Sequence, residues 1–339
     1  MAREARRTGD PGATAEPRRR GDLDRTRLAL AAASFLAACT FHAAGPGLGA
    51  ADPWLAPAFF AVAGCSAGLA PWRGAGARVV ALVQRLFVPA VTGSLLFAVP
   101  LFYLERPGEV SEWAGHLAFL PALLVCSAAM LPLLARLRTL RGRALADRLA
   151  RPVTLTIVLL LPAVLPAALA AIPCVGGMAW PVGACAAGYA LGAVVVTGPA
   201  LEEAVNRRRW ASLGASVVLL AAFAAAQAND VPAARAARPL LEAAAAGSLM
   251  PLVLGFGLRR ASAERLVAPR LNDYVLPFFL LSRPAFLAVG RAAAGFPIGA
   301  AVRAAIATVA AAALAIGICE LVRRARLPRF LFGLRERSD

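Results

Sequence analysis

The chain consists of long apolar segments separated by short polar ones. Ten segments of about 17–25 residues, the length at which an α-helix crosses a bilayer, contain few charged side chains. They cover approximately residues 28–44, 54–70, 79–103, 116–135, 153–172, 178–198, 210–228, 240–258, 274–291 and 297–322. Backbone groups cannot stay unpaired in hydrocarbon, and the polar–apolar alternation of a membrane barrel is absent. The pattern predicts an all-α, polytopic membrane bundle of about ten transmembrane helices.

The basic residues fall in alternate connections between these segments. Eight arginines precede residue 28, and the other arginine-rich segments hold two in 71–78, six in 136–151, three in 199–209, four in 259–270 and six from Arg323 onward. These are 29 of the 36 basic residues; the others are Arg85, Arg106, Arg235, Arg238, Arg283, Arg291 and Arg303. Cytoplasmic loops of membrane proteins are enriched in arginine and lysine. Both termini are therefore expected in the cytoplasm, as an even number of spans requires.

Composition supports the membrane assignment and removes one alternative. Hydrophobic residues make up 60% of the chain and charged residues 16%, against about half and a quarter in soluble domains. The net charge of +17 comes from arginine alone, since the chain has no lysine. Because the topology accounts for most of this charge, we do not expect a nucleic acid as partner. The expected partner is the lipid bilayer, in a bacterial inner or plasma membrane.

The pattern divides the chain into three parts. Residues 1–26 are rich in arginine, proline and glycine and are expected to form a disordered cytoplasmic leader. This leader lacks the apolar core and cleavage site of a removed signal peptide. Residues 27–326 form the ten-span domain, and residues 327–339 form a cytoplasmic tail.

Several kinds of site are not indicated. The six cysteines are scattered and nearly all lie within spans, without the spacing of a metal site, so we expect no metal and no permanently bound cofactor. No phosphate loop, dinucleotide fingerprint or G-x-S-x-G motif occurs. An ATP-driven pump and a serine nucleophile are therefore poorly supported.

The two histidines of the chain are the leading candidates for chemistry. His42 is predicted near the outer end of the first span and His116 at the outer start of the fourth, on the same side of the membrane. A neutral imidazole can take a proton from a hydroxyl group and later return it, which is the chemistry of acyl transfer to an alcohol. The simpler alternative for each is an interfacial histidine bound to water or backbone.

Two further ionisable residues belong to the third span. Arg85 is expected one to two turns into it from the cytoplasmic side, where a guanidinium could line the entry of an anionic group or simply snorkel to the interface. Glu105 ends the same span, where it could orient a histidine or serve as a solvated cap. Ionisable residues inside a membrane are costly and usually face the bundle interior.

Six stretches together resemble the acyltransferase-3 family, closest to the branch that includes glucan biosynthesis protein C. They are FHAAG (Phe41–Gly45), PAFFAVAGCSAGLA (Pro57–Ala70), VQRLFVPAVTGSLLFAVPLFYLE (Val83–Glu105), HLAFLPALLVCSAAMLPL (His116–Leu133), DYVLPFFLLSRPAFLAVG (Asp273–Gly290) and LPRFLFGLR (Leu327–Arg335). The resemblance extends over nearly the whole chain. Residues from about 140 to 265 contribute hydropathy rather than motifs.

The family pattern matches residue by residue at several positions and departs from the chain at others. The matching residues are His42, Phe59, Phe60, Gly64, Arg85, Pro89, His116, Leu117, Phe119, Leu120, Pro277, Phe278 and Pro284. The departures are Ala63 for a serine, Leu276 and Phe279 for tyrosines, Ser282 for a histidine and Arg283 for a glutamine. Ala31 also stands where the family has an arginine, and Arg27 lies one turn earlier.

The resemblance implies an enzyme that transfers a short acyl group, of acetyl or succinyl type, from acyl-CoA to a hydroxyl of a carbohydrate or related acceptor. In this reading His42 is the general base, and His116 helps to orient the acceptor or the base. Arg85 and Glu105 serve substrate binding, with Ser282 and Arg283 as further candidates. Acyl-CoA is then a co-substrate, and a glycan or glycoside of the cell envelope is the acceptor.

Two other functions stay open from the sequence. An inactive relative that acts as a scaffold in envelope biosynthesis would need neither histidine. A small-molecule transporter would need a polar pathway open to both faces, and the shortage of acidic residues in the spans argues against a proton-coupled carrier.

Overall fold

The structure, a computed structural model, describes residues 26–27, 29–33, 51–72, 74–98, 119–170, 176–229, 231–258, 274–296 and 299–334. All regular secondary structure in these ranges is helical, as predicted. The first half contains α2 (Ala51–Leu69), α3 (Ala75–Leu82), η2 (Val83–Phe87), α4 (Val88–Gly93), η3 (Ser94–Ala98), the segment Phe119–Ala129, α7 (Leu131–Leu137), α8 (Leu140–Leu149) and α9 (Pro152–Ala170). The second half contains α10 (Gly176–Thr197), α11 (Pro199–Arg207), α12 (Arg209–Ala228), α13 (Pro232–Gly257), α15 (Val275–Ala294), α16 (Ala300–Val322) and α17 (Arg326–Leu331).

The apolar helices agree with the predicted spans. Among the described residues, four helices are long and apolar enough to cross a bilayer, and the number rises to eight when each pair bent at a short break is taken as one span. The fifth and sixth predicted spans are separate helices, since α9 ends at Ala170 and α10 begins at Gly176. Most of the first predicted span, 28–44, lies outside the described residues. The total of ten spans and the cytoplasmic placement of the termini stay predictions.

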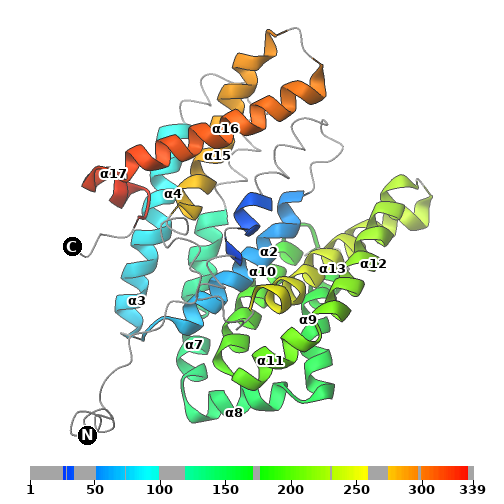
Figure 1. Cartoon of the computed structure of the whole chain (residues 1–339). Helices are drawn as coiled ribbons and strands as arrows, with labels where there is room; N and C mark the ends of the chain where they lie inside the picture. The colour runs from blue at the N-terminus through cyan, green and yellow to red at the C-terminus, as the bar shows by residue number, and fades with distance from the viewer. Residues whose placement is uncertain are drawn as a thin grey trace, which may run out of the picture.

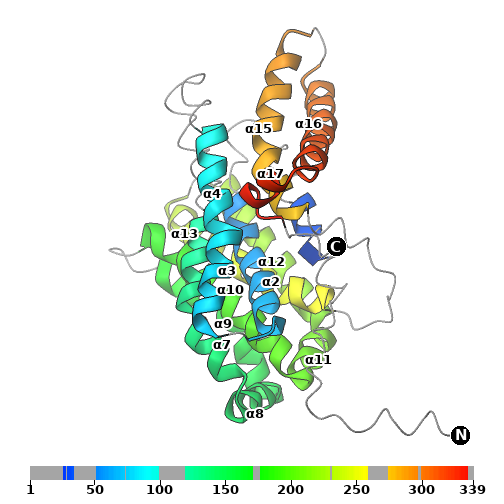
Figure 2. The same cartoon turned by 90° about the vertical axis from the view of Figure 1, so that its left-hand side faces the viewer.

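The helices form a central bundle from which two helix pairs project. α2 and α10 lie at the centre, α12 and α13 form one projecting hairpin, and α15 and α16 form another (Figure 1). Figure 2 shows the α15–α16 pair rising above the other helices, while α8 and α11 lie at the opposite end. The largest buried cluster joins α2, α9, α10, α11 and α13, and another joins α4, α15, α16 and the segment that follows α17.

The centre of the bundle depends on glycines that let two helices touch. A Cβ atom on Gly192 of α10 would lie 1.8 Å from the Ala61 carbonyl oxygen of α2, and one on Gly64 would lie 2.0 Å from the Tyr189 carbonyl oxygen. Each helix carries two glycines four residues apart, the G-x-x-x-G spacing of close helix crossings in membranes. Small residues therefore set the distance between α2 and α10.

Two short helices occupy segments that hydropathy assigns to connections. α8 lies within the predicted connection 136–151, and α11 lies within 199–209. α8 makes an angle of 90° with Pro152–Ala168 of α9, and α11 makes an angle of 114° with Pro181–Thr197 of α10. α8 begins after Thr139, whose hydroxyl accepts a hydrogen bond from the Gly142 amide (3.2 Å), as an N-cap does.

Two arginines cap the carboxyl end of α2. Arg78 donates a hydrogen bond to the Ala67 carbonyl oxygen (2.7 Å), and Arg138 donates to the carbonyl oxygens of Gly68 (3.1 Å) and Ala70. Burial, and then the charge of Arg78, lowers the pKa of the Arg138 guanidinium from its ordinary value. Cations at a helix C-terminus satisfy its last carbonyls and complement its dipole. The two side chains thus fasten α2 to α3 and α7.

We expect Gly192→Ala to lower the free energy of unfolding by about 3 kcal/mol, because the new methyl group must push α2 and α10 apart. Gly317→Ala in α16 is the matched control, since a Cβ there meets nothing within 4 Å. That variant should be neutral or slightly more stable. Thermal unfolding of the purified variants in detergent micelles checks this; equal melting temperatures would show that the α2–α10 contact is not limiting.

We expect Arg138→Ala to lower the free energy of unfolding by about 2 kcal/mol, because the carbonyl groups at the end of α2 lose charged donors. Arg138→Lys should retain part of this stability, since it keeps the charge but not the planar guanidinium. Arg324→Ala, at an exposed arginine, should change stability by no more than about 0.5 kcal/mol. The capping role is refuted if Arg138→Ala unfolds at the same temperature as Arg324→Ala.

Candidate functional site

The predicted site residues fall into three groups. His42, Glu105 and His116 lie outside the described residues. Arg85 lies in η2 and is exposed, 10 residues after the first residue of α3. This helix begins at Ala75, before the predicted span 79–103, and Arg85 lies about 15 Å along it. Ser282 and Arg283 lie within α15.

Aromatic side chains from three of the motif-bearing helices meet in one cluster. The Phe119 ring centroid lies 5.7 Å from that of Phe59, 5.3 Å from that of Phe60 and 5.3 Å from that of Phe279. Phe59 and Phe60 belong to α2, Phe119 begins the described part of the fourth span, and Phe279 belongs to α15. The rings of α2 meet Phe119 edge to face, the arrangement that aromatic pairs favour. We call these four residues the aromatic junction.

The aromatic junction lies close in sequence to three of the predicted site positions. Phe119 follows His116 by three residues, and Phe279 precedes Ser282 by three. α15 bends by 42° between Val275–Leu281 and Pro284–Ala293, so that Ser282 and Arg283 occupy the bend itself. Pro284 accounts for the bend. In a straight helix its ring would collide with the carbonyl group four residues earlier, and its backbone nitrogen has no hydrogen to donate to that group. The junction thus holds Phe119 and Phe279 in place, each of them three residues from a predicted site position.

The helix that carries Arg85 is distorted at that residue. Val83–Phe87 forms a π-turn, closed by the Val88 amide and the Val83 carbonyl oxygen. Pro89 explains the wider turn, because in a regular α-helix its ring would collide with the Arg85 carbonyl group. The backbone of Gly333, at a φ of 68°, approaches this place so closely that a Cβ would lie 2.8 Å from Pro89 Cγ and 3.1 Å from the Arg85 oxygen. π-turns of this kind occur frequently at functional sites.

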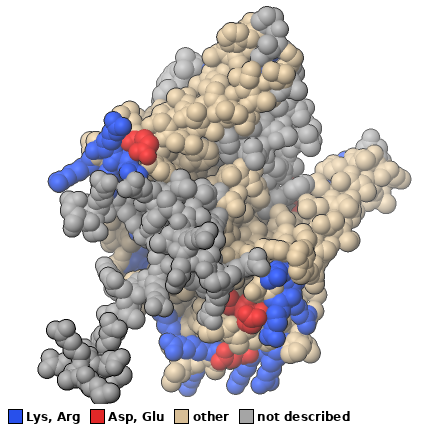
Figure 3. Space-filling view, in the orientation of Figure 1, with Lys and Arg blue, Asp and Glu red and all other residues tan. Residues whose placement is uncertain are grey.

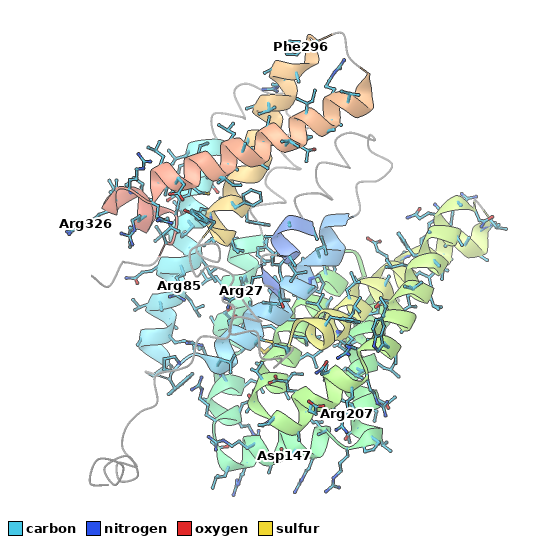
Figure 4. The ribbon with its side chains drawn as sticks, in the orientation of Figure 1. Arg27, Arg85, Asp147, Arg207, Phe296 and Arg326 are labelled. Atoms are coloured by element: carbon cyan, nitrogen blue, oxygen red, sulfur yellow. The ribbon has the colours of Figure 1, made fainter. Side chains whose placement is uncertain are left out.

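The segment after α17 holds this distorted helix in place. Phe332 is 5% exposed and packs in a buried cluster with Ala90 of α4, Leu120 and Leu280. Residues 327–334, expected as part of a tail, therefore bring a fourth motif stretch to the cluster beside Arg85 (Figure 4).

A polar contact joins the beginning of the first span to α2. Arg27 donates a hydrogen bond to the Ser66 hydroxyl group, which in turn donates to the Val62 carbonyl oxygen (2.7 Å). Thr26 lies against Gly257 of α13, and Leu30 is buried with α2 and α13 residues. The start of the first predicted span is thus held against α2 and α13.

A tyrosine, a glutamate and an arginine form a triad between α15 and α16. Tyr274 donates a hydrogen bond to a Glu320 carboxylate oxygen, and Arg323 donates to the Tyr274 hydroxyl oxygen (2.7 Å). Arg323 also lies 3.8 Å from the Glu320 carboxylate, and its guanidinium lies over the Tyr274 ring. Tyr274 and Glu320 were not singled out as site residues in the sequence analysis.

Glu202 is the buried carboxylate that sequence reasoning missed. It lies in the first turn of α11 and is only 4% exposed. The positive end of the helix dipole stabilises an anion at that place. Hydropathy assigned residues 199–209 to a polar connection, but a proline followed three residues later by a glutamate is a helix-start signal that could have revealed it.

The described part of the site consists of the aromatic junction together with Arg85 and the Tyr274–Glu320–Arg323 triad. Among the residues that the structure describes, no three histidine, cysteine, aspartate or glutamate side chains lie close enough together to hold a metal ion.

Comparison with known proteins identifies the family. A family model described as an acyltransferase domain, of the acyltransferase-3 type, matches residues 25–320. No curated protein and no solved structure matches the chain. The matched residues include all the apolar helices of the bundle and both sides of the aromatic junction. The chain belongs to the acyltransferase-3 family of membrane acyltransferases.

Proposed function

We propose that the protein transfers a short acyl group, acetyl or succinyl, from acyl-CoA to a hydroxyl group of a carbohydrate or related acceptor of the cell envelope. The observation that carries the proposal is the aromatic junction, because it joins three stretches that bear the family motifs within one matched domain. The motif order, nearest to the branch that includes glucan biosynthesis protein C, favours a carbohydrate acceptor.

In the proposed reaction His42 acts as general base. Its imidazole removes the proton of the acceptor hydroxyl as the oxygen attacks the thioester carbonyl, and the coenzyme A thiolate leaves and takes the proton back. His116 orients the acceptor or the base, and Glu105 holds the orienting histidine. Ser282 and Arg283, at the bend of α15, would contribute hydrogen bonds to the substrate.

Arg85 is proposed to bind the phosphates of the acyl donor. It is exposed and lies where the helix widens to a π-turn, and a planar guanidinium matches the geometry of phosphate oxygens. In the predicted topology both termini are in the cytoplasm. The end of the third span that is nearer to Arg85 then faces the cytoplasm, which supplies acyl-CoA.

We expect His42→Ala to reduce acyl transfer by about 10²–10⁴-fold, because the acceptor hydroxyl loses its general base. Membranes that contain wild type or variant are incubated with radiolabelled acetyl-CoA and an envelope-glycan mixture, and the label in the acceptor is counted. Equal transfer in both would reject His42 as the base. If neither transfers label from acetyl-CoA or succinyl-CoA, the inactive scaffold becomes the better explanation.

We expect Arg85→Ala to raise the KM for acyl-CoA by about 10–100-fold while kcat changes little, because a charge-assisted hydrogen bond to the donor is lost. Arg85→Lys should recover part of the affinity. Arg324→Ala removes an exposed arginine outside the proposed machinery and should leave both constants unchanged. An Arg85→Ala enzyme with the wild-type KM would remove Arg85 from the donor site.

A further inference from the structure

We infer that α8 is an interfacial helix whose exposed arginines bind the phosphate groups of anionic phospholipids in the adjoining leaflet. α9 has 19 residues and no charged side chain, so it is about long enough to span the hydrocarbon layer. α8 makes an angle of 90° with it. The helix therefore runs along the membrane plane, at the depth of the lipid headgroups.

One side of α8 packs against the rest of the protein, and its other faces are exposed. Gly142 and Ala146 are buried: Gly142 packs against the backbone of Arg136 and Leu137, and Ala146 packs against Gly198. The remaining faces present exposed arginines, namely Arg141, Arg143, Arg148 and, just after the helix, Arg151. Figure 3 shows basic side chains gathered along the lower edge of the molecule, over α8 and α11.

The charge of this surface is not neutralised within the described part of the protein. Residues 136–151 hold six arginines and one acidic residue, Asp147. The guanidinium groups of Arg141, Arg143, Arg148 and Arg151 make no hydrogen bond or ion pair with any residue that the structure describes. By contrast, Arg138 is engaged at the end of α2, and Arg208 donates to the Thr156 hydroxyl group (2.9 Å).

Apolar side chains interleaved with these arginines favour a lipid over a soluble anion. Leu140 is 84% exposed, Leu145 is 42% exposed and Val153, at the start of α9, is 75% exposed. Interfacial helices place such side chains among the acyl chains below the headgroups. On α8, Leu145 lies one turn from Arg141 and from Arg148, so that apolar and basic side chains share an exposed face that can contact both acyl chains and headgroup phosphates.

The test measures lipid binding by native mass spectrometry of the full-length protein in uncharged detergent, titrated with dioleoyl phosphatidylglycerol or dioleoyl phosphatidylcholine. Wild type should retain phosphatidylglycerol in preference to phosphatidylcholine. In Arg141→Gln/Arg148→Gln the dissociation constant for phosphatidylglycerol should rise by about 25-fold at low salt, about fivefold for each arginine, the equivalent of about 1 kcal/mol each.

Arg324→Gln/Arg326→Gln is the matched control, because it removes two exposed arginines from another surface of the same protein. It should change the dissociation constant by less than about twofold, and all variants should melt at the temperature of wild type. An equal loss of binding in both double variants would reduce the effect to net charge and overturn the inference. Displacement of phosphatidylglycerol by free coenzyme A, lost in Arg141→Gln/Arg148→Gln, would also overturn it by assigning the surface to the acyl donor.

Discussion

The constraint on which the structure depends is that the ends of membrane helices must find hydrogen-bond donors for their last carbonyl groups. Arginine side chains meet it at three helix ends. Arg138 and Arg78 close α2. Arg238 donates to the carbonyl oxygens of Ala226 (2.9 Å) and Asn229 (3.0 Å) at the end of α12, and Arg303 donates to that of Phe296 (3.1 Å) after α15. A guanidinium with five donors can reach several carbonyls at once, which an ammonium group does less well.

This constraint also explains two of the arginines that lie outside the predicted cytoplasmic segments. The orientation with both termini inside predicts 29 of 36 basic residues on one side and leaves Arg238 and Arg303 among the exceptions. Each of the two is engaged with the end of a helix. Some arginines of this chain therefore cap helix ends, and this use cannot be recognised from the distribution of charge along the sequence.

The sequence predicts the apolar helices well because their signal is additive over about 20 residues. It does not reveal α8 and α11, since each is short and amphipathic and its hydropathy resembles that of a loop. The sequence likewise does not predict the aromatic junction, because Phe59, Phe119 and Phe279 are far apart in sequence and only helix packing brings them together. Arg85 could be singled out as a charge in an apolar segment. The wider turn that surrounds it depends on Pro89 and on Gly333, about 240 residues away.

The hydrogen bond between Arg27 and Ser66 joins the start of the first predicted span to α2. The chain has Ala31 and Ala63 where the family has an arginine and a serine, and Arg27 and Ser66 lie one turn away on the same faces of their helices. The first span and α2 are consecutive, and both residues are displaced toward the end where Arg78 and Arg138 close α2. Arg27 and Ser66 are hydrogen-bonded to each other. This hydrogen bond therefore ties the start of the first predicted span to the helix that carries Phe59 and Phe60.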